Sequence, residues 1–130
     1  MKMQKLKKLK MKKIIISVRC ASKGIRYAFA TERNIRVHLL VFILVLIAGI
    51  AFGISKIELL LIFAISAVNF SLELANTAIE RLADKVSPVY DEQIGVVKDV
   101  MAGAVLVSSI FAIIFGLAIF FEPLLKLFQR

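Results

Sequence analysis

The 130-residue sequence is poor in several residue types, with one cysteine, one histidine, two prolines and no tryptophan. A lone Cys20 excludes an intramolecular disulfide, and one Cys with one His cannot supply the ligand set of a zinc site. Charged residues make up 21% of the chain, whereas 60% are hydrophobic, well above the roughly half expected of a soluble domain. The composition therefore indicates a membrane protein.

The common nucleotide-binding motifs are also missing. No G-x-x-x-x-G-K-[ST] phosphate loop is present, nor a protein-kinase catalytic loop or D-F-G motif. A signal peptide is not expected, because the first long apolar stretch begins only at Val37. Any nucleotide chemistry in this chain would need a site of another kind.

Three apolar stretches are long enough to cross a membrane. Residues 37–55 and 100–121 are continuous, and the run 59–72 reaches full length if it continues to Ile79 past Glu73. A spanning helix needs about 20 such residues. We therefore predict an all-α membrane protein, with transmembrane helices at about 36–54, 57–84 and 98–121. Pro123 is expected to end the third of these helices.

Positive charge gathers in the first 36 residues, in which Glu32 is the only acid, and the net charge is +9. The positive-inside rule then places the N-terminus in the cytoplasm, and the chain in the cell membrane. Residues 1–13 form a lysine-rich N-terminal extension of a domain at 14–130. Lysine-rich segments can bind nucleic acid, but each basic residue also gains about 1 kcal/mol near anionic lipid. With membrane helices following, we expect lipid attraction and no nucleic-acid partner.

A surface helix is expected at about 14–31. Apolar residues recur there every three or four positions, at Ile14, Val18, Ala21, Ile25 and Phe29. Basic residues lie to one side of this stripe, which is typical of a helix lying flat on the cytoplasmic leaflet. Such a helix either anchors the chain or covers a site at the membrane surface.

The segment 73–84 carries acids into a helix that is otherwise apolar. With about 100° of rotation per residue, one face collects Glu73, Asn76, Thr77, Glu80 and Asp84. Ion pairs at a helix end could explain Glu80 and Asp84, and Asn76 alone could join two helices. Glu73 lies deeper, where a charge costs at least about 2.5 kcal/mol and usually faces a bundle interior or a polar cavity.

Other charged residues flank the same membrane edge. Glu32 precedes the first membrane helix, and Lys98 and Asp99 open the third. Carboxylates, amide oxygens and water suit Mg²⁺, and nearby basic residues suit a metal–polyphosphate complex. Structural readings remain open, because Glu32 can pair with Arg36 and Asp99 can stabilise a helix N-terminus. The G-x-x-x-G at 49–53 predicts close helix packing.

Three blocks resemble, in order, the prokaryotic membrane lipid kinases of the diacylglycerol kinase and undecaprenol kinase family. They are S-K-G-I-R-Y-A-F with E-R-N-I-R-V-H (22–38), E-L-A-N-T-A-I-E with Asp84 (73–84), and V-K-D-V-M-A-G-A-V-L (97–106). The resemblance implies a homotrimer of three-helix subunits with active sites between subunits at the cytoplasmic face. It also implies transfer of the γ-phosphoryl of Mg-ATP to the hydroxyl of a membrane lipid alcohol.

The resemblance assigns roles by motif position. Glu73 matches the base that takes the lipid hydroxyl proton, and the catalytic residues are Glu73, Asn76, Lys98 and Asp99. The metal-binding carboxylates are Glu32 and Glu80. Nucleotide contacts are expected from Glu32, Glu80, Tyr90, Asp91, Lys98 and Asp99. Lipid contacts are expected from Lys23, Arg26, Asn34, Arg36 and Glu73.

The block at 32–38 is similar to the Gram-positive branch, whose members are mainly undecaprenol kinases, although Ile35 replaces an aromatic residue often seen there. We expect undecaprenol as the acceptor, giving undecaprenyl phosphate, with diacylglycerol and phosphatidic acid as the alternative. A different class, a non-enzymatic cation-conducting oligomer, would line a pore with these carboxylates. Their position at the membrane edge, rather than along a full-length stripe, argues against it.

Overall fold

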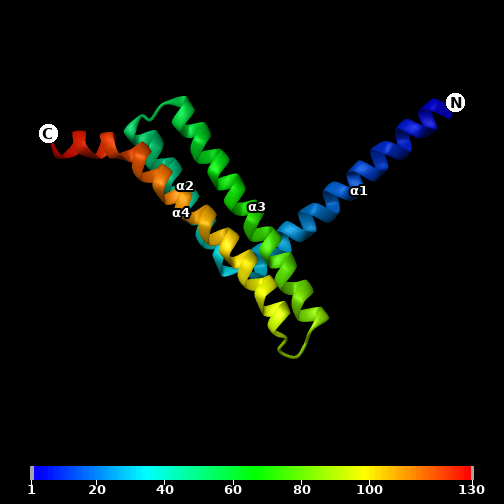
Figure 1. Ribbon diagram of the computed structural model, residues 1–130. Coiled ribbons are helices and arrows are strands. Elements are labelled where there is room, and N and C mark those ends of the chain that lie inside the picture. The colour runs from blue at the N-terminus through cyan, green and yellow to red at the C-terminus, as the bar shows by residue number, and fades with distance from the viewer. Residues whose placement is uncertain (1, 130) are drawn as a thin grey trace. The chain divides into compact units, whose positions relative to one another are not determined.

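The computed structural model describes residues 2–129, which form four α-helices (Figure 1). In chain order these are α1 (Lys2–Thr31), α2 (Arg33–Phe52), α3 (Lys56–Val86) and α4 (Glu92–Phe128). The chain divides between Glu32 and Arg33 into two compact units, the first built by α1 and the second by α2, α3 and α4.

The first unit is a single helix that is longer than expected. The sequence predicts a surface helix at about 14–31, whereas α1 already begins at Lys2 and includes the lysine-rich extension. Lys, Leu, Met and Gln are good helix formers, and no proline interrupts them. At the other end the Glu32 N–H donates to the Ala28 carbonyl (2.8 Å). The surface location of α1 stays a prediction.

The three helices of the second unit are long and apolar enough to cross a membrane, as the sequence predicts. Their described spans are Arg33–Phe52, Lys56–Val86 and Glu92–Leu127. Few side chains of this unit are buried, and most of its large apolar side chains are exposed. That distribution is expected of helices whose surroundings are lipid tails rather than water.

A tight turn joins α2 to α3. Gly53 has a φ of +68°, and its N–H donates to the Ile50 carbonyl (3.1 Å), while the Ile54 N–H donates to the Gly49 carbonyl (3.0 Å). This pair of bonds is the Schellman motif, which needs a left-handed residue at the position of Gly53. The next helix begins with a capping box, in which the Ser55 N–H donates to Glu58 Oε2 (2.7 Å).

The turn allows α2 to approach α3 closely. A Cβ added to Gly49 would lie 2.7 Å from Ile54 Cδ1 and 3.9 Å from Ile62 Cδ1, so this position has little room for a side chain. Nearby, Phe42 of α2 meets Phe63 of α3 edge to face, with ring centroids 5.2 Å apart. The first glycine of the G-x-x-x-G thus lies against the turn residue Ile54, and the second forms the turn itself, so the close helix packing predicted from this motif stays a prediction.

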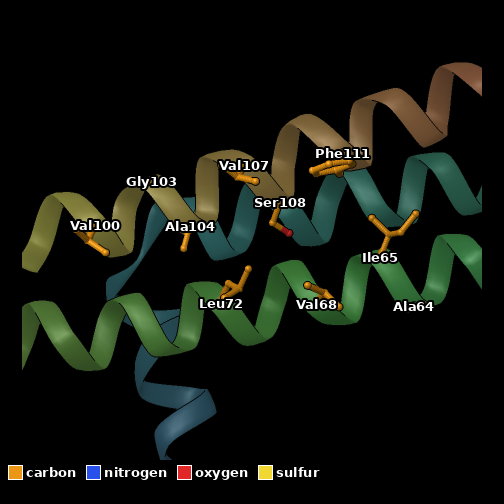
Figure 2. Close-up of a pocket in the computed structure, with 10 residues that line it drawn as sticks. All are labelled: Ala64, Ile65, Val68, Leu72, Val100, Gly103, Ala104, Val107, Ser108 and Phe111. Carbon is orange, nitrogen blue, oxygen red and sulfur yellow. The ribbon is translucent and has the colours of Figure 1, made fainter.

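Helices α3 and α4 run antiparallel and lie side by side (Figure 1). Between them is an apolar groove of about 660 Å³, lined by small and branched side chains that include Val68, Leu72 and Ala104 (Figure 2). Within this apolar interface Ser108 Oγ donates a hydrogen bond to the buried Asn69 Oδ1. Serine and asparagine often join membrane helices in this way.

Helix α4 differs from the sequence prediction at both ends. It begins at Glu92 rather than at residue 98, because Asp91 caps it by accepting from the Gln93 and Ile94 N–H groups (2.9 and 3.1 Å). It also continues through Pro123, which was expected to end it. Proline removes one helical hydrogen bond and bends the helix, and Figure 1 shows α4 changing direction toward its C-terminal end.

Candidate functional site

Polar side chains follow one face of α3 in its second half, because the helix is unbroken from Lys56 to Val86. Glu73 and Thr77 are buried, with exposed fractions of 2% and 5%. Glu80 is half-buried and Asp84 is exposed. The face therefore becomes more accessible toward the end of the helix, and Glu73 is its most enclosed carboxylate.

Asn76 and Glu80 form a pair on this face. Asn76 Nδ2 donates to Glu80 Oε1 (3.0 Å) across one helical turn. Asn76 Oδ1 is buried and accepts no hydrogen bond from the described residues. A buried amide oxygen without a partner is costly, so its presence here favours a ligand that supplies a donor, a water or a cation.

Glu73 contacts a residue of α2. His38 Nε2 lies 3.2 Å from Glu73 Oε1, and the side chains are 25% and 3% exposed. No sequence pattern predicts that these two residues meet, because they lie on different helices. His38 is the only titratable residue in the apolar run 37–55. A titratable residue inside such a run often contacts another polar group, and this is the signal that could have indicated the contact with Glu73.

Lys98 joins α4 to α3. Its Nζ lies 3.0 Å from Asp84 Oδ1, so the expected nucleotide-contacting lysine is held by a carboxylate of the polar face. Asp99 is exposed and lies within α4, about two turns after its start. The alternative that the Asp99 charge stabilises the N-terminus of this helix is therefore wrong, because the first turn begins at Glu92.

Tyr90 and Asp91 lie in the short connection between α3 and α4. The Tyr90 side chain is 88% exposed, which leaves its ring accessible to a planar ligand. Asp91 uses Oδ1 to accept from two N–H groups of α4, so this residue has a structural role besides any contact with a nucleotide. The nucleotide role of both residues stays a prediction.

The remaining candidates lie near the boundary between the two units. Lys23 and Arg26 are exposed residues of α1, and Glu32 follows that helix, where Thr31 Oγ1 donates to its Oε1 (3.2 Å). Asn34 and Arg36 are exposed residues of the first turn of α2. The meeting of Glu32 with Glu80 at one metal ion stays a prediction.

Within residues 2–129, no three His, Cys, Asp or Glu side chains gather closely enough to hold a metal ion. Mg²⁺ does not require such a cluster, because it is usually bound by one or two carboxylates together with waters and substrate phosphates. The half-buried Glu80 carboxylate and the buried Asn76 oxygen are donors of the hard type that this ion prefers. The residues present therefore fit a magnesium ion shared with a phosphate ligand.

The fold is that of an all-α, multi-pass membrane protein. Its site has a buried carboxylate, Glu73, on a polar face of α3, and charged residues near the end of α3 and the start of α4. Residues 19–120 match the family described as prokaryotic diacylglycerol kinase, and the chain belongs to this family.

Two relatives are similar over most of this chain. A diacylglycerol kinase of Synechocystis is 37% identical over 115 residues, which are 88% of this chain and 66% of the relative. An undecaprenol kinase of Bacillus subtilis is 39% identical over 104 residues, which are 80% of this chain and 85% of the relative. The chain thus spans just under two thirds of the first relative, and the two identities do not separate the two substrates.

Proposed function

We propose that this protein is a lipid kinase that transfers the γ-phosphoryl group of Mg-ATP to the hydroxyl of undecaprenol, giving undecaprenyl phosphate and ADP. The single observation that carries the proposal is a carboxylate, Glu73, that is 2% exposed within an apolar helix, on the same face as the Asn76–Glu80 pair. Membrane helices rarely bury an acid that has no function. Membership of the family and the names of both relatives agree with kinase chemistry.

In this proposal Glu73 acts as the general base. The lipid hydroxyl oxygen attacks the γ-phosphorus, the bond between that phosphorus and the β–γ bridging oxygen breaks, and ADP leaves with its electron pair. The hydroxyl proton passes to Glu73. A lipid alcohol approaches from the membrane, so a base about two helical turns further into α3 than Glu80 is well placed to reach it.

The more accessible residues would bind the nucleotide. Glu80 with Glu32 would hold Mg²⁺, assisted by the Asn76 oxygen, and the ion would neutralise charge on the phosphates. Lys98 carries a positive charge near the same face, where it already contacts Asp84. Phosphoryl transfer depends mainly on such positioning and charge neutralisation. Tyr90, Asp91 and Asp99 would complete the nucleotide site.

The choice of undecaprenol rests on the block at 32–38, which ends in His38 and resembles the Gram-positive branch of the family. We further propose a homotrimer with its active sites between subunits, and an N-terminus and sites on the cytoplasmic side of the cell membrane. The charge of the first 36 residues supports this orientation.

The test is phosphoryl transfer from radiolabelled Mg-ATP by the purified protein in lipid, with undecaprenol and diacylglycerol supplied separately and then in competition. We expect a labelled lipid product, with the higher kcat/KM for undecaprenol. A preference for diacylglycerol would overturn the substrate but keep the kinase. Absence of turnover with any lipid alcohol, together with ion flux in liposomes, would favour the non-enzymatic alternative.

A further inference from the structure

Glu73 is enclosed to a degree that raises the question of what holds its carboxylate in place. Its side chain is 3% exposed, and it lies on a helix that is mostly apolar. A base of this kind must keep one oxygen aimed at the substrate hydroxyl, because rotation about its terminal torsion is broad and two-fold. A polar group on a neighbouring helix can restrict that rotation.

His38 is such a group. Its Nε2 lies 3.2 Å from Glu73 Oε1, and it reaches across from α2, so the contact depends on tertiary packing. Both helices are long and continuous at these positions, and Ile35, one turn earlier on α2, is completely buried. The imidazole is therefore presented by a helix that is fixed near this point.

The imidazole also borders an apolar cavity of about 530 Å³ between α2, α3 and α4. Its walls are almost entirely hydrocarbon, with the His38 ring and Asn69 among the few polar groups. His38 thus contacts the carboxylate while it lies beside a space that water enters at a cost. An uncompensated carboxylate in such surroundings is unfavourable, and a neighbouring N–H donor or cation reduces that cost.

We propose that His38 is a positioning residue for Glu73: its Nε2, 3.2 Å from Oε1, restricts rotation of the carboxylate that accepts the proton of the lipid hydroxyl. This proposal rests on the proposed function and adds a residue to it. His38 acts through Glu73 and has no contact with the transferred phosphoryl group in this assignment. The same pairing, in which a second group orients a catalytic one, is general among enzyme sites.

The first experiment measures the contact without activity. His38 is the only histidine in the chain, so selective ¹⁵N labelling of histidine gives imidazole NMR signals from this residue alone. In the full-length protein in lipid, Glu73→Gln should shift these signals, whereas Glu122→Gln, at an exposed ion pair with Lys126, should not. Unchanged imidazole signals in Glu73→Gln would overturn the proposal, whether or not the protein is a kinase.

The second experiment measures catalysis. His38→Ala should lower kcat by about 10- to 100-fold, the usual effect of losing a group that orients a catalytic or metal-bound residue, with the KM for Mg-ATP nearly unchanged. His38→Gln, which keeps a polar side chain at this position, should recover part of the loss. Leu39→Ala, a neighbouring half-buried position on α2, is the matched control and should retain wild-type kcat.

A double-mutant cycle separates positioning from a purely structural role. If His38 acts through the carboxylate, His38→Ala should have little further effect on kcat in a Glu73→Asp background, since the two losses are not additive. Equal losses in both backgrounds, or a fully active His38→Ala protein, would overturn the proposal. An inactive wild-type protein would instead refute the proposed kinase, and the NMR measurement would still decide whether the contact exists.

Discussion

The two ends of the three-helix unit use the same helices in different ways. At the turn end, residues 49–62, Gly49 leaves room for the Ile54 side chain, and the Schellman motif and the capping box satisfy the backbone. At the polar end, residues 73–98, Glu73 of α3 is instead buried beside His38. Asp84 of α3 also forms an ion pair with Lys98 of α4. The turn end contains what a stable membrane hairpin needs, and the polar end contains groups that such a hairpin does not need.

The two ends therefore separate the residues that hold the helices together from those of the proposed chemistry. In lipid, helices associate through close packing of small residues and a few hydrogen bonds, and the Asn69–Ser108 bond is a contact of this kind. A buried carboxylate adds a desolvation cost that its contacts only partly offset. Substitutions at the polar end should therefore change activity with little effect on stability, and those at the turn end should do the reverse.

The largest expected effect is that of Glu73→Gln at the polar end. Loss of the general base should lower kcat by about 100- to 10,000-fold, while the unfolding temperature changes little, because glutamine keeps the size of the side chain and its hydrogen-bonding groups. Lipid phosphorylation and thermal unfolding in the same detergent check both statements. A variant that loses stability in proportion to activity would erase the distinction between the two ends.

Glu80→Gln should have the next largest effect. Removing a metal-binding carboxylate should reduce activity by at least about 100-fold at ordinary Mg²⁺ concentrations, and more Mg²⁺ should recover part of it. The amide oxygen of the new glutamine can still accept the hydrogen bond from Asn76 Nδ2, so the helix should fold normally. A magnesium titration of activity is the measurement, and a fully active variant would refute the metal role of Glu80.

At the turn end, Gly49→Ala should be less stable than Gly116→Ala by about 1–2 kcal/mol in free energy of unfolding, because the flexible end of the Ile54 side chain must move to admit the new methyl group. Both changes add the same methyl group to a helical glycine, but only at Gly49 does the new Cβ meet another side chain, at 2.7 Å, while at Gly116 nothing lies within 4 Å. Reversible unfolding in mixed micelles measures the difference. Activity per folded molecule should match the wild type in both variants.

The smallest expected effect is that of Ser55→Ala, which removes the N-cap of α3. The loss should be about 1 kcal/mol in free energy of unfolding. Ser71→Ala is the control, because the Ser71 hydroxyl donates only to the Ala67 carbonyl within α3 and caps nothing. Equal stability of the two variants would show that the capping box contributes little at this membrane edge.

Much of the fold could be predicted because hydropathy acts along the chain. The three apolar stretches became α2, α3 and α4, and the polar residues of 73–84 share a face because helical rotation alone fixes that relation. The ends were less predictable. Asp91 starts α4 before residue 98, and Pro123 bends this helix without ending it, since neither outcome is decided by hydropathy.

The site was predictable only where its residues lie on one helix. Glu73, Asn76 and Glu80 stand out in the sequence because they interrupt an apolar period. The contacts of His38 with Glu73 and of Asp84 with Lys98 join different helices, and so does the bond between Ser108 and Asn69. No periodicity encodes such pairs, because they depend on how the helices are rotated and shifted against one another.

Three helices long and apolar enough to cross a membrane, with a line of acids entering one of them, could be predicted from the amino-acid sequence alone, because apolar length and helical rotation are local properties. The sequence also carries the blocks that mark the family. Only the tertiary structure decided that Glu73 is the enclosed acid, that His38 meets it and that Lys98 reaches Asp84. Burial and cross-helix contact arise from packing, in which each residue's surroundings are supplied by helices distant in the sequence.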